Sequence, residues 1–275
     1  DLYGAIWSWK MKKAKLVTTI HQDTFVTEKY RIGAFWGPIY VYAWMLLQSF
    51  CFDGVIFISK QIRDTYEKYF KGVKTVIYNG VYCDYSIPVN KHFISEINDL
   101  KAKGLKMLGT YALIMKRKGI KQVLQFLKQN PGYGFVIIGD GAEKQNLQIM
   151  SKEFGIADRV LFLPHVPNPY CYLDDIDIYT MTSYSEAFGL AMVEAALSEK
   201  PIVCSNLPSF HEIFTEDEAC FFDLDNISSL SEAIRKSYAN KEQLGLKAKE
   251  KAERYFTAKK NAENHLNYYK SLLSK

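Results

Sequence analysis

The sequence has few cysteines and lacks the patterns in which cysteines form disulfides or bind structural zinc. Its 275 residues include five cysteines, an odd number, and no two of them form a C-x-x-C pair. Disulfide-stabilised secreted domains and zinc ribbons both depend on such paired cysteines. We therefore expect a chain that folds in a reducing compartment without disulfides or structural zinc.

The sequence also lacks clustered charge, internal repeats, low-complexity runs and a secretory signal peptide. Its 35 lysines and arginines exceed its 30 aspartates and glutamates by five, and the cations are scattered along the chain. A nucleic-acid-binding protein instead concentrates its cations in one stripe. This balance excludes a nucleic-acid interface and leaves room for a mildly basic face toward anionic lipid or a phosphorylated ligand.

The hydrophobic pattern indicates an α/β protein with two domains. Hydrophobic residues make up 48% of the chain, enough for two modest cores. Short apolar runs alternate with helical patterns, which is typical of parallel sheets covered by helices on both faces. A polar stretch over 83–103 separates the two series, and we expect an irregular linker there. The expected strands are 14–20, 53–59, 74–78, 106–111, 135–138, 159–163, 178–182 and 201–204.

Residues 32–52 contain no charged side chain and are rich in Trp, Tyr and Phe. Length alone makes this stretch a candidate membrane span. Gly37 and Pro38 interrupt its first third, however, and Gln48 interrupts its end. Three interpretations stay open: a helix packed on its own domain, a helix partly buried in a membrane interface, and a true span.

Two glutamates, Glu186 and Glu194, lie eight positions apart between two expected strands. On a single helix, residues so spaced are separated by about 12 Å along the axis and roughly 80° around it, too far to share one metal ion. A helix N-terminus between them would offer free backbone N–H groups to phosphate. The spacing therefore suits an extended ligand such as a nucleotide sugar, with phosphates in the middle. The alternative is a surface helix with two solvated glutamates.

The stretch Y-S-E-A-F-G-L-A-M-V-E closely resembles the E-x7-E signature of retaining GT-B glycosyltransferases, family 4. The resemblance extends over most of the chain from about residue 14 and implies two Rossmann-like domains facing across a cleft. It implies that Glu186 lies near the donor sugar and that Glu194 binds the ribose hydroxyls. The backbone amides of Phe188, Gly189 and Leu190 would contact the phosphates.

The same resemblance assigns catalytic and phosphate-binding roles to residues outside the signature. His21, after the strand expected at 14–20, would face the donor sugar from the first domain. Lys118, in the K-R-K-G stretch, would neutralise the departing diphosphate. Thr110 stands where the family has an arginine, so the second phosphate contact falls to Lys116 or Arg117. Plain loop roles are the alternative for the histidine and for the three cations.

Gly139 and Gly141 form a G-D-G turn that matches the nucleotide-side loop of the family. Glycine at such a turn lets the backbone approach a ligand closely, although any βα turn can contain the pattern. Asn79-Gly80 is a strong turn dipeptide. We expect it to form a turn just before the crossover to the second domain.

The expected domains are a partial, acceptor-side domain over 1–95, a nucleotide-sugar-binding domain over 104–257, and a helix over 258–275 that returns to the first domain. In that helix the Tyr268-Tyr269 and Leu272-Leu273 pairs would dock on the first domain. The chain starts at Asp1 directly in element-like sequence. We expect the first domain to lack its opening strands and its glycine-rich loop.

These features predict transfer of a sugar from a UDP- or GDP-sugar to a glycan or lipid-linked acceptor, with retention of configuration. The setting suggested by the resemblance is bacterial surface polysaccharide assembly (O-antigen, capsule or lipopolysaccharide), in the cytoplasm or at the inner face of the plasma membrane. No metal or other cofactor is expected, since the family uses helix dipoles and cations. The alternative is a non-catalytic nucleotide-sugar-binding protein or an inactive fragment.

Overall fold

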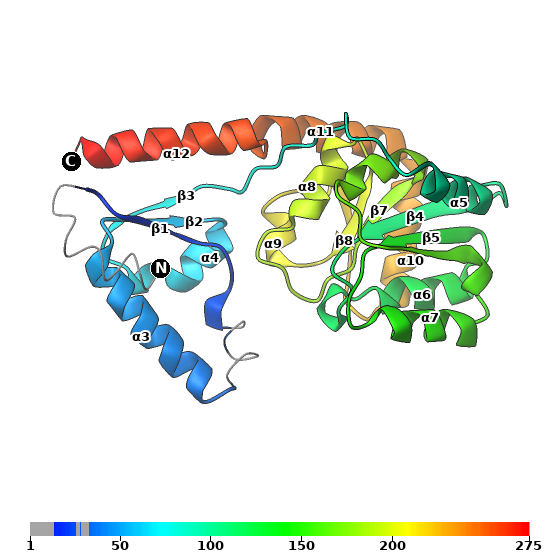
Figure 1. Cartoon of the computed structure of the whole chain (residues 1–275), viewed down its shortest axis with the longest axis horizontal. Helices are drawn as coiled ribbons and strands as arrows, with labels where there is room; N and C mark the ends of the chain where they lie inside the picture. Colours follow the sequence, from blue (N-terminus) through cyan, green and yellow to red (C-terminus); the bar gives the residue numbers. More distant parts are fainter. Residues whose placement is uncertain (1–13, 26–27, 29–32, 275) are drawn as a thin grey trace. The chain divides into compact units, whose positions relative to one another are not determined.

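The computed structural model describes residues 14–25, 28 and 33–274, which form two compact α/β units (Figure 1). One unit comprises Asp1–Gly80 with Thr257–Lys275, and the other comprises Val81–Phe256. The first residues of the chain and Ile32, where the uncharged stretch begins, lie outside the described residues.

The first unit is built on a parallel sheet with the strand order β1-β2-β3. The central strand β2 is buried along its whole length because neighbouring strands and helices enclose it. Helix α3 connects β1 to β2, and α4 with the short helix η1 connects β2 to β3. The bounds are β1 (Val17–Ile20), α3 (Trp36–Cys51), β2 (Gly54–Phe57), α4 (Lys60–Tyr66), η1 (Glu67–Tyr69), β3 (Val73–Val76) and α12 (Ala258–Leu273).

Helix α12 packs on this sheet although it is the last element of the chain. The Tyr268 hydroxyl donates a hydrogen bond to the Val73 carbonyl at 2.6 Å, and Leu272 is buried. Tyr269 and Leu273, expected to dock in the same way, are exposed. One residue of each pair faces the sheet because neighbouring positions on a helix point in different directions.

Helix α3 uses only part of its apolar surface for packing. Its buried residues, Gly37, Val41, Met45 and Gln48, form one stripe at helical spacing. The opposite stripe is apolar as well and is exposed. Among the helices of the described residues, none combines the length and apolarity needed to cross a bilayer.

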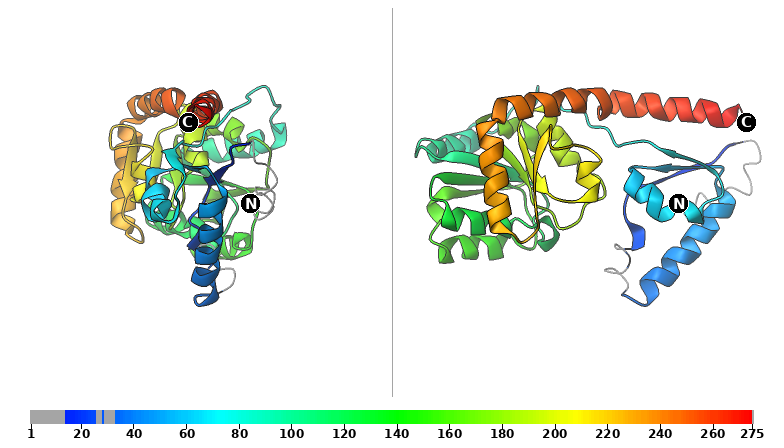
Figure 2. Two further views of the ribbon diagram at one scale, coloured as in Figure 1. Left: turned by 90° about the vertical axis from the view of Figure 1, so that its left-hand side faces the viewer. Right: turned by 180° about the vertical axis from the view of Figure 1, so that it is seen from behind.

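The second unit contains a six-stranded parallel sheet in the order β6-β5-β4-β7-β8-β9. Helices lie on both sides of it (Figures 1 and 2). The strands are β4 (Lys106–Tyr111), β5 (Tyr133–Ile138), β6 (Val160–Leu163), β7 (Ile178–Met181), β8 (Ile202–Ser205) and β9 (Ala219–Phe222). The helices are α5 (Lys91–Lys101), η2 (Lys116–Lys118), α6 (Lys121–Gln129), α7 (Lys144–Glu153), η3 (Ala157–Arg159), η4 (Pro169–Asp175), α8 (Leu190–Leu197), α9 (Pro208–His211), α10 (Ile227–Ala239) and α11 (Lys241–Tyr255).

The main core of this unit lies between the sheet and helices α6, α7 and α10. Leu108 and Phe135 of the sheet meet Leu124 and Phe126 of α6 and Ile234 of α10, and all five are fully buried. Removing an apolar side chain of this size from water stabilises the folded state by about 1.5–3 kcal/mol. This rigid sheet fixes the ends of its strands, from which the loops of the site extend.

The strand order reverses between β4 and β7. From β4 the chain moves outward to β5 and β6, then returns to the other side of β4 and moves outward again to β8 and β9. The connections after β4 and β7 therefore lead in opposite directions along the sheet, and their loops meet at its carboxyl edge. Doubly wound sheets bind their ligands at this switch point.

Only the first part of residues 83–103, up to Asn90, is irregular as we predicted. The rest contains helix α5, which is capped by the Asn90 side chain and buries Ile97 and Leu100 within the second unit. Pro88 and the asparagines are residues typical of irregular segments, and for this reason the sequence pattern hides the helix. Asn90 instead begins the helix, since an asparagine side chain satisfies a free N–H group of the first turn.

Asn79-Gly80 does not form the predicted turn. The chain continues without one, and the Val81 amide donates to the Phe256 carbonyl at 2.9 Å. A Cβ atom on Gly80 would lie 2.3 Å from the Thr257 carbonyl oxygen. The glycine is therefore required by close backbone packing.

Candidate active site

Lys118 and Glu186 meet at the switch point of the second unit. Lys118 ends η2 in the loop after β4, and Glu186 lies in the loop between β7 and α8. The Lys118 Nζ atom is 2.5 Å from Glu186 Oε1, and the two side chains are only 19% and 11% exposed. Limited exposure reduces screening by water and salt. The loops thus hold a cation and a carboxylate as a close pair.

Both carboxylate oxygens of Glu186 accept contacts from neighbouring side chains. Ser183 Oγ donates to Oε1 at 2.9 Å, and Arg117 Nη1 lies 3.3 Å from Oε2. Arg117 also donates to the Ser185 carbonyl at 2.5 Å. Lys116 is exposed to solvent. The Ser183 hydroxyl had no predicted role, although Ser183 precedes Glu186 by only three positions.

A helix N-terminus lies between the two signature glutamates, as predicted, so that they do not share one helix. Helix α8 begins at Leu190, after Glu186, and only Glu194 is helical. Gly189 precedes the helix with φ 103°, a left-handed conformation that glycine adopts readily and that cannot continue a helix backward. The expected separation along one helix axis therefore does not apply.

The start of α8 has the features of an anion-binding helix end. No side chain of the described residues caps it, and Leu190 is exposed. Phe188 is buried, with its ring centroid 5.8 Å from that of Phe256, and this contact fixes the loop before the helix. The first N–H groups of a helix have no partner within the helix and carry a partial positive charge.

Glu194 occupies a different environment from Glu186. It lies half-buried in the second turn of α8, and no ion pair joins it to any described residue. Burial raises its pKa, and the Tyr111 hydroxyl partly offsets this effect. Tyr111, the last residue of β4, also donates to the Ala191 carbonyl at 2.9 Å. Glu194 is thus a carboxylate held near the end of β4 without a compensating cation.

Gly139 and Gly141 lie against the loop after β4. Their φ values are 143° and 152°, and added Cβ atoms would lie 2.0 Å and 2.2 Å from the carbonyl oxygens of Ala112 and Ile114. The Ile114 amide donates to the Asp140 carbonyl at 2.8 Å. The close backbone approach shown by the structure is between two loops of the protein, and it supports the loop that contains Lys118.

His21 follows β1 in the first unit and is exposed. The buried side chain of Tyr66 holds this loop: its hydroxyl donates to the Asp23 carboxylate and accepts a hydrogen bond from the Phe25 amide at 3.0 Å. Burial and the nearby carboxylate raise the pKa of Tyr66. His21 therefore belongs to a loop whose following residues, Asp23 and Phe25, are held in place by Tyr66.

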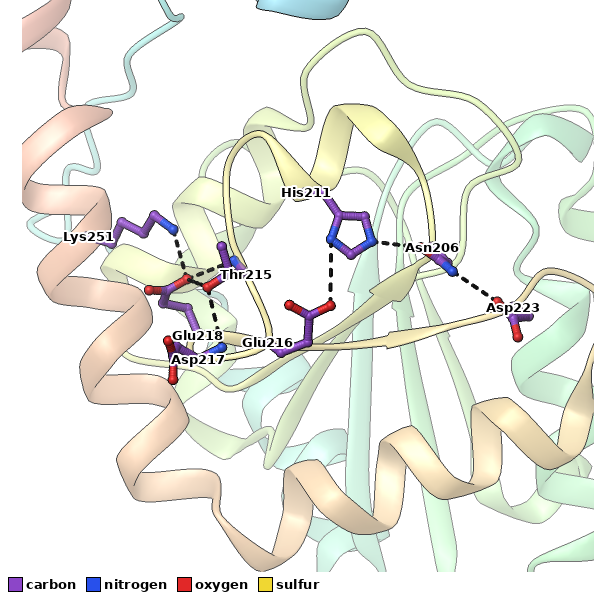
Figure 3. Close-up of polar contacts among 8 residues, drawn as sticks. All are labelled: Asn206, His211, Thr215, Glu216, Asp217, Glu218, Asp223 and Lys251. Atoms are coloured by element: carbon purple, nitrogen blue, oxygen red, sulfur yellow. Dashed lines mark hydrogen bonds and ion pairs between the residues drawn. The ribbon is translucent and has the colours of Figure 1, made fainter.

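A separate polar network lies at the ends of β8 and β9 (Figure 3). Asn206 Nδ2 donates to Asp223 Oδ1 at 3.0 Å, so its Oδ1 accepts from His211 Nε2 at 2.7 Å. The His211 ring stacks on Phe221 at 3.9 Å. The network fixes α9 to the strand ends. Figure 3 also shows contacts that tie α11 to the β8–β9 connection, made by Thr215, Asp217, Glu218 and Lys251.

The aspartates before β7 are used in structural contacts. Asp177 accepts a hydrogen bond from the Met107 amide at 2.8 Å and pairs with Lys241 at 2.9 Å, and Asp175 pairs with Lys101 at 3.0 Å. No group of three or more potential metal ligands occurs within the described part of the chain. The five cysteines are free thiols.

Two family models match the chain. Glycosyl transferases group 1 matches residues 94–262, and Glycosyltransferase Family 4 matches residues 1–85. The chain belongs to the group 1 glycosyl transferases. The resemblance to the group 1 and family 4 glycosyltransferases, inferred from the signature, is therefore confirmed.

Two similar proteins act in the synthesis of bacterial surface polysaccharides, and one of them matches most of this chain. The O-antigen biosynthesis glycosyltransferase WclY of Escherichia coli is 32% identical over 268 residues, which cover 94% of this chain and 73% of that protein. The lipopolysaccharide core biosynthesis glycosyltransferase LpsD of Rhizobium meliloti is 28% identical over 123 residues, 44% of this chain and 36% of that protein.

Solved structures of glycosyltransferases share the fold. Anabaena HepE in complex with UDP and glucose has a TM-score of 0.80 and 20% identity, over 98% of this chain and 75% of that chain. Staphylococcus aureus TarM in a complex that includes UDP has a TM-score of 0.73 and 20% identity, over 94% and 51%. The predicted GT-B fold, an α/β architecture with parallel sheets, is confirmed.

Proposed function

We propose that this glycosyltransferase moves a sugar from a nucleoside diphosphate sugar to a glycan or lipid-linked acceptor, with retention at the anomeric carbon. One observation supports this function: the Lys118–Glu186 pair lies at the switch point, and Glu186 belongs to the loop that leads into the uncapped start of α8. A cation and free N–H groups together complement a diphosphate. Surface polysaccharide assembly is the setting, supported by the printed roles of WclY and LpsD.

Lys118 and the N-terminus of α8 stabilise the charge that develops on the diphosphate as it leaves. One such donor, when fixed in advance, is worth about 2.7–4 kcal/mol in the transition state. Arg117 supplies the second cation of the site, and Lys116 is exposed close by in η2. Glu194 accepts hydrogen bonds from the ribose hydroxyls, for which its uncompensated carboxylate is suited.

The reaction breaks the bond between the anomeric carbon and the phosphate oxygen, and the electron pair leaves with the diphosphate. The acceptor oxygen forms its bond on the same face, and its proton passes to the departing phosphate oxygen. Glu186 and His21 orient the sugar. Covalent attack by Glu186 is disfavoured because both of its oxygens already accept contacts from Ser183, Lys118 and Arg117.

The donor is a UDP- or GDP-sugar, and UDP-sugars are the first to test because the HepE and TarM complexes contain UDP. The cations and the helix end of this chain act where other enzymes use a divalent ion, so the proposal includes no metal or other cofactor. The Gly139–Gly141 turn, which supports the β4 loop, lies on the nucleotide side of the site in this proposal.

In this proposal the enzyme is cytoplasmic and binds to the inner face of the plasma membrane. The exposed stripe of α3 contacts anionic lipid there. Trp36, Leu46 and Phe50 are 63%, 62% and 69% exposed, and Lys71 Nζ lies 4.6 Å from the Phe50 ring centroid. An apolar stripe beside a cation is suited to the boundary between headgroups and acyl chains. Co-sedimentation with phosphatidylglycerol vesicles should fall when these three apolar residues become serine. Leu246→Ser, at an exposed position of α11, should leave it unchanged.

A thermal-shift screen of UDP-, GDP- and ADP-sugars tests the function, followed by an assay for released nucleoside diphosphate with polyprenyl-diphosphate-linked glycans. We expect one donor class to stabilise the protein and to be consumed, with the product keeping the anomeric configuration of the donor in NMR spectra. Binding without turnover would support the alternative, a non-catalytic nucleotide-sugar-binding protein. An inverted product would contradict the proposed stereochemistry alone.

A further inference from the structure

One buried side chain connects three loops around the candidate active site. Gln122 lies in the first turn of α6, and none of its surface is exposed. Its Nε2 donates to the carbonyl oxygens of Thr182 at 3.0 Å and Gly119 at 3.3 Å. Its Oε1 accepts from the backbone amide of Asp225 at 2.8 Å. These three backbone groups belong to the loops after β7, β4 and β9.

The loops after β4 and β7 also contact each other directly at this point. Thr182 Oγ1 donates to the Lys118 carbonyl at 3.1 Å, and the Tyr184 amide donates to the Arg117 carbonyl at 2.8 Å. Gly119 has φ 62°, and an added Cβ atom would lie 2.0 Å from the Thr182 carbonyl oxygen. The backbones of the two loops are therefore in contact where the buried amide joins them.

The turn between β9 and α10 supports the β7 loop from another side. Asp225 adopts a left-handed conformation with φ 57°, which is uncommon for a residue other than glycine. Gln122 binds its amide, and its carboxylate accepts a hydrogen bond from the Tyr184 hydroxyl. Lys121 Nζ lies 3.9 Å from the same carboxylate. The turn is thus held in place by the first turn of α6 and by the β7 loop.

We infer that Gln122 is a positioning residue for the transfer reaction. Its amide fixes the loops that contain Lys118 and Glu186, so that the ammonium and carboxylate groups keep their 2.5 Å separation. Gln122 acts through these backbones and does not contact the donor. A displacement of about 1 Å in a catalytic group can slow a reaction roughly 100-fold. The effect on turnover rests on the proposed function, whereas the effect on the loops does not.

Gln122→Met tests the inference because it keeps a side chain of similar length and removes the amide. Gln129→Met, at the exposed end of the same helix, is the matched control. By hydrogen exchange we expect faster exchange in residues 116–120, 182–186 and 223–226, with β5 and β8 unchanged. Exchange that rises uniformly over the second unit, or does not rise, would contradict the inference.

The second measurement is turnover. It is followed as the release of nucleoside diphosphate, with the nucleotide sugar that the wild-type chain consumes as the donor. We expect kcat to fall about 10- to 100-fold while the Kd for UDP changes little. In a Lys118→Ala background the same substitution should change turnover little, because the group that it positions is gone. Additive losses would indicate a merely structural role and overturn the inference.

Two further outcomes stay interpretable. If the wild-type chain consumes none of the UDP-, GDP- or ADP-sugars, the proposed function fails, and hydrogen exchange alone decides whether Gln122 fixes the loops. If Gln122→Met does not fold, Gln122→Glu at pH 8 replaces it. In that variant one carboxylate oxygen still accepts a hydrogen bond from the Asp225 amide. The other oxygen replaces the Nε2 donor and faces the carbonyl oxygens of Thr182 and Gly119. Wild-type exchange and turnover in Gln122→Glu would contradict the inference.

Discussion

Glu186 and Glu194 belong to one signature, yet the structure gives them opposite electrostatic surroundings. Glu186 lies in a loop, paired with Lys118 and Arg117 and hydrogen-bonded by Ser183. Glu194 lies on a helix, half-buried, and burial raises its pKa. The first carboxylate is neutralised before any ligand arrives, and the second is not.

This difference suggests that the two glutamates make different contributions to the reaction. A carboxylate that is already paired gains little from a new hydrogen-bond donor, and it serves to hold its cations in place. A partly desolvated carboxylate without a cation gains more from ligand hydroxyls, because they replace the water that it lost. We therefore expect substitutions around Glu186 to affect turnover and substitutions at Glu194 to affect donor binding.

Lys118→Ala should have the largest effect, a fall in kcat of about 10²- to 10³-fold, because the leaving diphosphate loses a preorganised cation. The Kd for UDP should change much less. Lys116→Ala, which removes an exposed cation from the same short helix, is the control and should retain nearly full turnover. Similar losses in the two variants would show that only the net positive charge of the loop matters.

Glu194→Ala should weaken donor binding by about 10- to 100-fold, since a hydrogen bond to a charged group contributes roughly 1.5–3 kcal/mol. Calorimetric titration with UDP measures the change, and kcat at saturating donor should stay close to the wild-type value. An unchanged Kd for UDP would remove the ribose assignment from Glu194. It would also show that the contrast between the two glutamates has no bearing on donor binding.

Arg117→Ala should have a smaller effect, about 3- to 10-fold in kcat, because an exposed cation is screened and contributes roughly 1 kcal/mol. The Arg117 side chain is 43% exposed and that of Lys118 only 19%. A loss equal to that of Lys118→Ala would mean that both cations contact the diphosphate. Rates at increasing salt distinguish the two cases, because a screened contribution should fade.

Most strands were predictable from the sequence because buried parallel strands are continuous apolar runs. β4, for example, has the predicted bounds. β9 was missed because A-C-F-F is short and follows an acidic turn. Helix α5 was missed because its asparagine cap was read as irregular structure.

The candidate site was predictable only as a list of residues. The signature identified Glu186 and Glu194, but it did not reveal that the helix between them begins only after Gly189, at Leu190. Gln122 had one signal that was available and unused, a polar residue between the apolar positions Ile120 and Val123 of a helix. Its three hydrogen bonds join segments up to 103 positions apart, and no local pattern shows such contacts.

The smallest effect that we predict tests the electrostatic state of Glu194 without any ligand. Its pKa in the folded chain is raised above the ordinary value of 4.5, so the folded state binds more protons than the unfolded state between these two values. Stability therefore falls as the pH rises through that window, and the penalty is complete above it. Glu194→Gln cannot ionise and avoids the penalty. It should raise Tm at pH 7.5 by roughly 2–4 °C, the shift that about 1 kcal/mol produces, and the difference should disappear near pH 4. A lower Tm at pH 7.5 would show that the Tyr111 contact outweighs burial, and the contrast with Glu186 would then be one of geometry alone.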